Sequence, residues 1–288
     1  MDIGIGIPNT IPGSTGTSLL EWAQRAETAG FSTLATIGAV SYPGFEELTL
    51  FAAAGAVTER IRFLSNVLIS PARSTAELAK QAATVDQLTG GRLTLGLGVG
   101  WRTSDFTLTG RDFGSRGKAF DSQLRDLHRA LDGKPIQEGT REVGPPTVQS
   151  PLPIMVGGNT EAAVRRVVEN DSVIGWTAGG MPPDAVADFG AKVRSAWAEA
   201  GRPGVPRIAA LTYFGLGDDE RSHANLRDYY IPMGAETAEM IAGFALRTPE
   251  AVKGAVAAYA DAGVDELLLD PSLPEPEQVD RLAEAAMA

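Results

Sequence analysis

The chain has 288 residues, of which 43% are hydrophobic, and it carries a formal net charge of −11 at pH 7. Nucleic acids and anionic membranes attract basic surfaces, so this acidic balance favours a small-molecule partner over either of them. Cysteine is absent and histidine occurs only at His128 and His223. Disulfides, a cysteine nucleophile and zinc sites rich in histidine or thiolate are therefore excluded, and no metal is expected.

The first ten residues, MDIGIGIPNT, do not resemble a signal peptide, because they carry an acid at position 2 and lack a long apolar core. No run in the sequence approaches the roughly 18 apolar residues of a membrane span. We therefore expect a cytoplasmic protein.

Apolar runs that suit buried strands alternate with segments of helical spacing. In the helix expected after Ser74, for example, Leu78, Ala82 and Val85 share one face. In chain order, the expected elements are a strand at 2–7, a helix at 17–29, a strand at 33–37, a helix at 46–58, a strand at 61–69, the helix after Ser74, a strand at 93–99, a helix at 120–131, a strand at 154–156, a helix at 161–167, a strand at 173–177, a helix at 184–200, a strand at 207–216, a helix at 249–262, a strand at 265–269 and a helix at 275–286.

This alternation predicts parallel strands, because each helix returns the chain to the same edge of the sheet. Eight strand–helix units favour a (β/α)8 TIM barrel, a fold of about 250 residues. An open doubly wound sheet is the alternative, although the first strand is not followed by the GxGxxG pattern of dinucleotide-binding folds.

Two segments repeat one pattern, as a barrel built from one unit would. AETAGFSTL at 26–34 and YADAGVDEL at 259–267 each contain a helix end, an Ala-Gly stop and a strand start. Gly30 and Gly263 are expected to be left-handed C-terminal caps.

The whole chain, 1–288, is expected to form one domain with an insertion at about 218–246, after the seventh strand. The insertion contains DYYIPMGAETAEMIAGFAL, which is apolar enough to pack. We expect a helical cap over the barrel mouth that excludes water, and a helical dimer surface is the alternative.

The functional residues of such a barrel lie at the carboxyl ends of its strands. The segments after strands two to six read IGAVSYPGF, SPARST, GWRTSDF, GGNT and AGGMPP. They supply glycines, hydroxyls, an Asn and a Trp, but no Ser-His-Asp arrangement, strand-end Lys or paired carboxylates. This composition indicates a site in which a bound organic cofactor carries the chemistry.

The run PIMVGGNTEAAVRRV at 153–167 leads from a strand through Gly157 and Gly158 into a helix. A helix that starts this way exposes unpaired backbone N–H groups, and its dipole favours an anion there. The run therefore predicts a phosphate site or, as the alternative, a tight turn in which Asn159 or Thr160 caps the helix.

Four motifs in order resemble the bacterial luciferase-like, flavin-dependent oxidoreductases. The run LAKQAATVDQLTGGRLTLGLGVGW at 78–101 is similar to the central signature of that family, and NVLISP at 66–71, the run at 153–167 and GWTAGGMPP at 175–183 follow the family's order. The resemblance implies a (β/α)8 barrel that binds FMN or the deazaflavin coenzyme F420, with the reduced form as electron donor.

The resemblance also implies which residues bind the cofactor. The glycine loop is expected to hold the cofactor phosphate, and a bulge in strand three is expected to support the flavin ring. Trp101 would face the ring or the substrate, or else serve as a core or rim residue. The expected cofactor-binding residues are Asn66, Val67, Trp101, Gly157, Gly158, Asn159, Thr160, Thr177, Ala178 and Gly179.

Three further residues, Tyr42, Tyr213 and His223, are candidates for a substrate pocket. His128 lies between apolar helix positions and is expected on the barrel shell instead. No catalytic residue is assigned.

The sequence departs from one branch of the family. Some deazaflavin-dependent sugar-phosphate dehydrogenases carry an Asp-His pair after strand two and a Glu after strand four, where this chain has residues 38–40 and Trp101-Arg102. That reaction is therefore not expected. The pair Asp105-Phe106 after GVGW resembles actinobacterial members often assigned to F420, which is analogy and does not decide between the two cofactors.

The sequence thus predicts a flavin- or deazaflavin-dependent oxidoreductase, a monooxygenase or a reductase, that acts on a small organic substrate as a homodimer. Two alternatives stay open. One is a cofactor-free isomerase or aldolase that uses the same phosphate loop, and the other is a non-catalytic flavin-binding protein.

Overall fold

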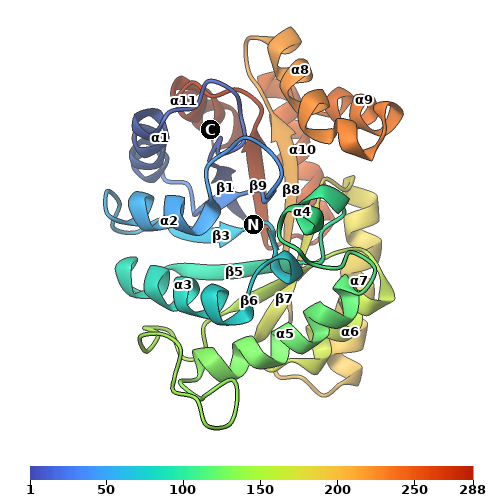
Figure 1. Cartoon of the computed structure of the whole chain (residues 1–288). Helices are drawn as coiled ribbons and strands as arrows, with labels where there is room; N and C mark the ends of the chain where they lie inside the picture. Colours follow the sequence, from blue (N-terminus) through green and yellow to red (C-terminus); the bar gives the residue numbers. More distant parts are fainter. Residues whose placement is uncertain (288) are drawn as a thin grey trace.

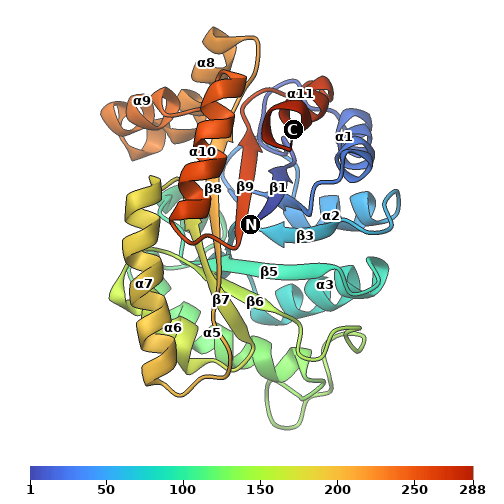
Figure 2. The same ribbon diagram turned by 180° about the vertical axis from the view of Figure 1, so that it is seen from behind.

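Eight parallel strands close into a barrel with helices around it, as Figure 1 and Figure 2 show from opposite sides. The computed structural model describes residues 1–287. The first strand pairs with both the second and the last, so the sheet is closed. The predicted (β/α)8 barrel is thereby confirmed. The strand segments are β1 (Asp2–Gly6), β2 (Thr33–Thr36), β3 (Arg62–Ser65), β4 (Leu68–Ile69), β5 (Leu93–Gly98), β6 (Ile154–Gly157), β7 (Val173–Gly179), β8 (Arg207–Phe214) and β9 (Glu266–Pro271).

The helices lie mainly between consecutive strands and cover the outside of the barrel. They are α1 (Gly16–Ala29), α2 (Glu47–Gly55), α3 (Thr75–Leu88), α4 (Thr103–Leu108), α5 (Arg116–Leu131), α6 (Glu161–Glu169), α7 (Pro183–Glu199), α8 (Asp219–Tyr230), α9 (Ala235–Gly243), α10 (Pro249–Asp261) and α11 (Glu277–Ala286), with 3-10 turns η1 (Ser70–Ala72) and η2 (Ile231–Met233).

Local chemistry explains where several helices begin and end. The Ser74 side chain accepts a hydrogen bond from the Glu77 N–H, so the predicted cap of α3 is confirmed. Gly30 and Gly263, with φ of 90° and 74°, adopt the predicted left-handed conformation after α1 and α10.

The third barrel strand is interrupted at the position where the family resemblance implies a bulge. The expected strand at 61–69 is divided into β3 and β4 at Asn66 and Val67, whose peptide bond is cis. Both halves pair with β5, so they form one member of the barrel. The sequence also does not predict α4, a single short helix after β5.

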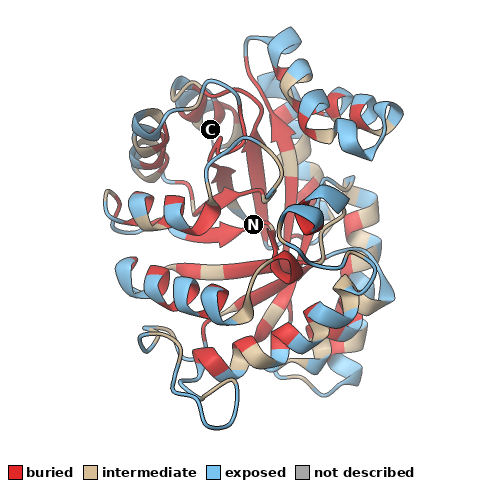
Figure 3. Ribbon diagram, viewed as in Figure 1, coloured by how far each residue is buried: buried red, intermediate tan, exposed pale blue. Residues whose placement is uncertain are grey.

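The insertion after β8, the seventh barrel strand, is helical as predicted. It contains α8, η2 and α9, which pack against one another beside the upper end of the barrel in Figure 1. Much of its outer surface is exposed (Figure 3).

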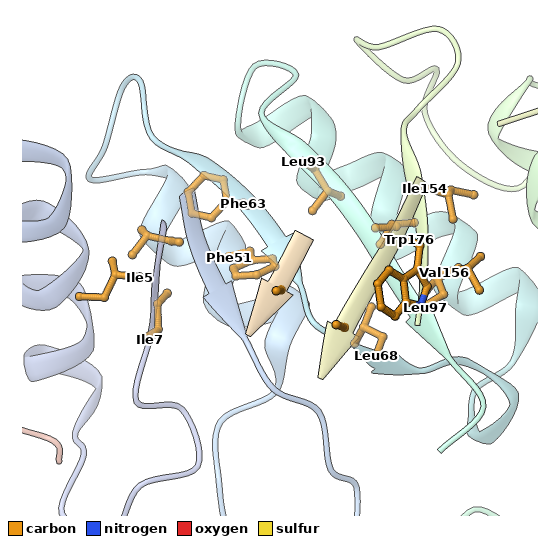
Figure 4. Close-up of a cluster of buried hydrophobic side chains, with 14 of the residues drawn as sticks. Ile5, Ile7, Phe51, Phe63, Leu68, Leu93, Leu97, Ile154, Val156 and Trp176 are labelled. Carbon is orange, nitrogen blue, oxygen red and sulfur yellow. The ribbon is translucent and has the colours of Figure 1, made fainter. Parts of the chain in front are cut away.

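Two layers of apolar side chains hold the barrel together. The larger layer lies between strands and helices, where Figure 4 shows Phe51, Phe63 and Trp176 among buried aliphatic side chains. The smaller layer fills the barrel interior with residues such as Leu64, Met155 and Leu268, and it forms the floor below the carboxyl ends of the strands. Within residues 1–287, no helix is long and apolar enough to cross a membrane.

Candidate active site

A cavity of about 400 Å³ lies at the carboxyl ends of the strands, within the usual size range of small-molecule sites. Strand ends and loops from β2 to β8 contribute to its wall, together with the insertion. Its lining residues are Ile37, Gly38, Asn66, Val67, Ile69, Gly98, Val99, Gly100, Trp101, Gly157, Gly158, Asn159, Thr177, Ala178, Gly179, Gly180, Met181, Leu211, Tyr213, Tyr229, Tyr230, Met233 and Ile241.

One side of the cavity, here called the glycine side, consists of the loops after β6 and β7. The Trp176 indole N–H donates to the Gly158 carbonyl at 2.6 Å, which fixes one loop to the neighbouring strand. Thr160 is the N-cap residue of α6, but its side chain makes no capping hydrogen bond. The first N–H groups of α6 are thus left for another acceptor, as at known anion sites.

Backbone atoms line this side closely because glycine leaves room for its neighbours. A Cβ atom at Gly157 would lie 2.9 Å from one methyl group of Val67. A Cβ atom at Gly98 would lie 2.6 Å from the other methyl group of Val67. At Gly179, by contrast, a Cβ would meet nothing within 4 Å. The space beside Gly179 is therefore open to a ligand.

Asn66 lines the cavity and has one unused hydrogen-bond donor. Its Oδ1 accepts a hydrogen bond of 2.8 Å from the Thr177 hydroxyl, which fixes the orientation of the amide. Its Nδ2 is buried and has no partner among the described residues. A buried donor without an acceptor is costly, so this atom marks a position where a ligand acceptor fits.

Another part of the wall, here called the aromatic side, is formed by Trp101, Tyr213, Tyr229 and Tyr230. The rings of Trp101 and Tyr230 lie near parallel, with centroids 6.1 Å apart and planes inclined by 20°. The hydroxyl groups of Tyr213 and Tyr230 form a hydrogen bond with each other. Tyr229 donates to the Gly38 carbonyl at 3.1 Å, which connects the insertion to the loop after β2.

Arg102 supports the aromatic side from behind. Its guanidinium lies within 5.5 Å of the ring centroids of Trp101, Tyr42 and Tyr229 and donates to the Tyr229 carbonyl at 2.9 Å. Its Nε and Nη1 atoms are buried and have no hydrogen-bond partner in the described part of the chain. Stacking on three aromatic faces thus takes the place of an ion pair.

Asp105 fixes the loop after β2 against the start of α4. Its Oδ1 accepts hydrogen bonds from the N–H groups of Val40 and Ser41, at 3.0 and 2.7 Å, and from the Ser41 hydroxyl at 2.8 Å. This buried carboxylate positions the segment that leads from Gly38 to Tyr42.

Asp270 lies at the carboxyl end of β9, beside the aromatic side. It is the register partner of Tyr213 in the β8–β9 ladder, and its Oδ1 lies 1.9 Å from where a Cβ at Gly6 would stand. The carboxyl group thus occupies space that glycine leaves free. Burial raises the pKa of Asp270 well above its usual value, and Oδ1 has no hydrogen-bond partner within residues 1–287.

The tyrosines of the aromatic side also keep their protons. Burial, opposed by the hydrogen bond to Tyr213, raises the pKa of Tyr230 to about 12. Burial and then the neighbouring Tyr230 raise the pKa of Tyr213, and burial likewise raises that of Tyr229. The three tyrosine hydroxyl groups are therefore neutral at pH 7.

Most residues expected at the cofactor site line this one cavity. They are Asn66, Val67, Trp101, Gly157, Gly158, Asn159, Thr177, Ala178 and Gly179, whereas Thr160 lies just outside the lining. Tyr213, a substrate-pocket candidate, lines the cavity as well.

The other two pocket candidates lie elsewhere. Tyr42 lines a separate cavity with Glu47 and Arg73, and its hydroxyl donates to Asp228 at 2.7 Å. Glu47 lines this second cavity. Its burial raises its pKa to about 7, although the nearby Arg73 opposes the shift. His223 pairs with Glu239 at 2.9 Å on the insertion, away from the cavity lining.

His128 lies on α5 with Asp132 at 3.6 Å, in agreement with its expected place on the shell. In the described chain, no cluster of three or more His, Cys, Asp or Glu residues is arranged for a metal ion.

Sequence reasoning missed the roles of Arg102, Asp105 and Asp270 in this arrangement. One signal for Asp270 is present, because an acid directly after the apolar run LLL falls at the carboxyl end of a barrel strand. Arg102 and Asp105 act on partners far away in the sequence, and no local pattern reveals those contacts.

Comparisons with known proteins agree with this architecture. The chain is 31% identical over 227 residues to an uncharacterized protein of Mycobacterium bovis, a match that covers 68% of this chain and 77% of the relative. An uncharacterized protein of Mycobacterium tuberculosis matches to the same extent.

Solved structures of low sequence identity share the fold. Monooxygenase RslO1 from Streptomyces bottropensis superposes with a TM-score of 0.79 at 21% identity, covering 100% of this chain and 99% of that one. An F420-dependent secondary alcohol dehydrogenase in complex with an F420-acetone adduct superposes with a TM-score of 0.76 at 16% identity, covering 99% of this chain and 98% of that one. The oxygenating constituent of 3,6-diketocamphane monooxygenase from Pseudomonas putida, in complex with FMN, has a TM-score of 0.71 at 17% identity. The match covers 98% of this chain and 96% of that one.

A family model described as luciferase-like monooxygenase matches residues 1–286, nearly the entire chain. The chain therefore belongs to the luciferase-like monooxygenase family.

Proposed function

We propose that this protein is an oxidoreductase that binds FMN or coenzyme F420 in the 400 Å³ cavity and acts on a small organic substrate. Membership of the family supports the class of reaction. The observation that carries the proposal is Asn66 Nδ2, a buried donor without a partner in the described chain, placed in a cavity with an open glycine side.

The residues of the cavity fit such a cofactor. The N–H groups at the start of α6 and the loop from Gly157 to Thr160 would hold its phosphate, because they combine free donors with the positive end of a helix dipole. Asn66 would donate to a ring heteroatom, and Val67 would lie against the ring. Gly179 and Gly180 would border the chain that connects ring and phosphate.

The bound cofactor would supply the electrons, and the protein would provide binding, orientation and exclusion of water. Met233 and Ile241 bring apolar side chains from the insertion to the cavity, while Tyr229 connects the insertion to the loop after β2. This apolar cover supports a role in keeping water away from a reduced cofactor.

The composition of the cavity weakens the cofactor-free alternative. Among its described lining residues there is no Lys, His, Asp or Glu, so an isomerase or aldolase would lack its base. A non-catalytic flavin-binding protein has the same static features and differs only in turnover.

Equilibrium binding of the purified protein to FMN and to F420 in parallel tests the proposal. We expect tight binding of one cofactor, with quenching of tryptophan fluorescence, because Trp101 lines the cavity. Binding of neither cofactor would overturn the proposal. Binding without oxidation of the reduced cofactor in the presence of either dioxygen or a panel of ketones and quinones would favour the carrier alternative.

A matched pair of variants at Gly179 separates the effect of charge on cofactor binding from the effect of side-chain size. A side chain fits there without a clash, whereas Gly157→Asp would force atoms against Val67. Gly179→Asp should weaken cofactor binding by about tenfold or more, because its carboxylate repels the phosphate. Gly179→Asn has the same shape without the charge and should retain most of the affinity. Equal losses in both variants would contradict a phosphate at this position.

A further inference from the structure

The charges around the cavity restrict what kind of substrate it accepts. Of its described lining residues none is charged, and the only ionisable side chains are Tyr213, Tyr229 and Tyr230. Arg102 is the nearest cation on the aromatic side, but its guanidinium is enclosed by the rings of Trp101, Tyr42 and Tyr229 and does not line the cavity. A buried anion in this space would have no cation to pair with.

The Tyr213–Tyr230 pair has one hydrogen-bond donor left over. Two hydroxyl groups carry two hydrogens, and the hydrogen bond between them uses one. The hydroxyl that accepts within the pair keeps its own O–H, and no further acceptor for either hydroxyl is found within the described residues. Because both side chains line the cavity, a substrate oxygen is the acceptor that fits.

The surroundings of this pair keep it neutral. Asp270 lies next to Tyr213 in the sheet register, and burial raises the pKa of its carboxyl group, so it does not add a charge at pH 7. The raised pKa values of the tyrosines, about 12 for Tyr230, have the same effect. The pair is therefore a donor to a neutral oxygen and not a base or an anion partner.

The border of this side is largely apolar. Trp101 and Tyr230 stack on each other, and Met233 and Ile241 add aliphatic surface from the insertion. An apolar ligand gains buried area against such a border.

We infer that the aromatic side selects an uncharged, largely apolar compound whose carbonyl or hydroxyl oxygen accepts a hydrogen bond from the Tyr213–Tyr230 pair. This inference rests on the proposed function, since it names the substrate class of the same cavity. It assigns specificity to residues on β8 and α8, which are separate from the expected phosphate loop.

Three probes of one ring size test the inference by calorimetric titration at pH 7. Naphthalene has no hydrogen-bonding oxygen, 2-naphthol has a neutral one, and 2-naphthoate carries a charge. The protein is titrated both alone and loaded with whichever cofactor binds. We expect 2-naphthol to bind about three- to tenfold more tightly than naphthalene, the gain of about one neutral hydrogen bond, and 2-naphthoate to bind most weakly.

Variants identify the atoms responsible. Tyr213→Phe and Tyr230→Phe should each remove most of the preference for 2-naphthol and leave naphthalene affinity unchanged. Ser195→Ala removes an exposed hydroxyl on α7 that hydrogen-bonds to Glu199 at 2.8 Å, away from the cavity lining, and it should change neither affinity.

Two results would overturn the inference. Equal affinities for naphthalene and 2-naphthol would show that no hydrogen bond is formed. Tighter binding of 2-naphthoate, lost in Arg102→Met, would show that Arg102 pairs with an anionic substrate. If a cofactor binds, neither of these results affects the proposed function. Failure of cofactor binding would overturn that function, whereas the probe titrations with the protein alone would still test the inference.

Discussion

The two sides of the cavity are built in different ways. The glycine side consists of short segments, each connecting one strand directly to the next helix, and it offers backbone donors with little side-chain bulk. The aromatic side brings together residues from β8, α8 and the loops after β2 and β5, which are far apart in the chain. The difference indicates that the first side is suited to a group held by backbone donors, and the second to a ligand recognised by side chains.

The largest effect should come from the hydrogen-bond network behind the aromatic side. Asp105→Ala leaves two loop N–H groups and the Ser41 hydroxyl without their acceptor, and hydrogen bonds to a buried carboxylate are strong. We expect a loss of about 2–4 kcal/mol in the free energy of unfolding, measured by urea denaturation.

The conservative variant Asp105→Asn keeps an oxygen in place. Its loss in the free energy of unfolding should be about half that of Asp105→Ala. If both variants are as stable as the wild type, Asp105 does not hold the loop, and the aromatic side has another anchor.

The two sides of the cavity also differ in how far the sequence predicts them. The barrel and the glycine loop could be predicted because each depends on residues adjacent in the chain, such as Ile154 to Thr160. The aromatic side depends on tertiary contacts, and no local sequence pattern distinguishes Tyr229 and Tyr230 from other surface tyrosines. Tyr42 and His223 have the expected residue type, but other partners, Asp228 and Glu239, hold them outside the cavity.

The hydrophobic pattern does not show the division of β3 and β4, although the family resemblance implies a bulge there. NVLISP reads as a continuous apolar strand, while the interruption at Asn66 involves contacts to Thr36 and Thr177 on other strands. Periodicity alone cannot predict such contacts.

Replacing Asp270 by Asn tests whether the aromatic side is neutral. Because burial raises the folded-state pKa of Asp270, the folded protein holds this proton more tightly than the unfolded chain does. The wild type should therefore lose stability relative to Asp270→Asn as the pH rises above about 4, until the folded pKa is reached.

Urea denaturation of both proteins at several pH values between 5 and 8 measures this difference, and the comparison cancels all other titrating groups. A constant difference across that range would mean that Asp270 is ionised in the folded protein. The tyrosines would then lie beside a negative charge, and the selection of an uncharged ligand would need another cause.

The smallest effect should come from the hydroxyl that orients Asn66 on the glycine side. Thr177→Val removes the hydrogen bond to Asn66 Oδ1 with little change in shape, and it leaves a buried acceptor unpaired. We expect about 1 kcal/mol lower stability and a several-fold weaker affinity for the cofactor, because Asn66 would no longer present Nδ2 in one orientation. Thr177→Ser retains the hydroxyl and should retain the affinity. If valine and serine behave alike, the orientation of Asn66 does not depend on Thr177, and the glycine side binds its ligand through backbone groups alone.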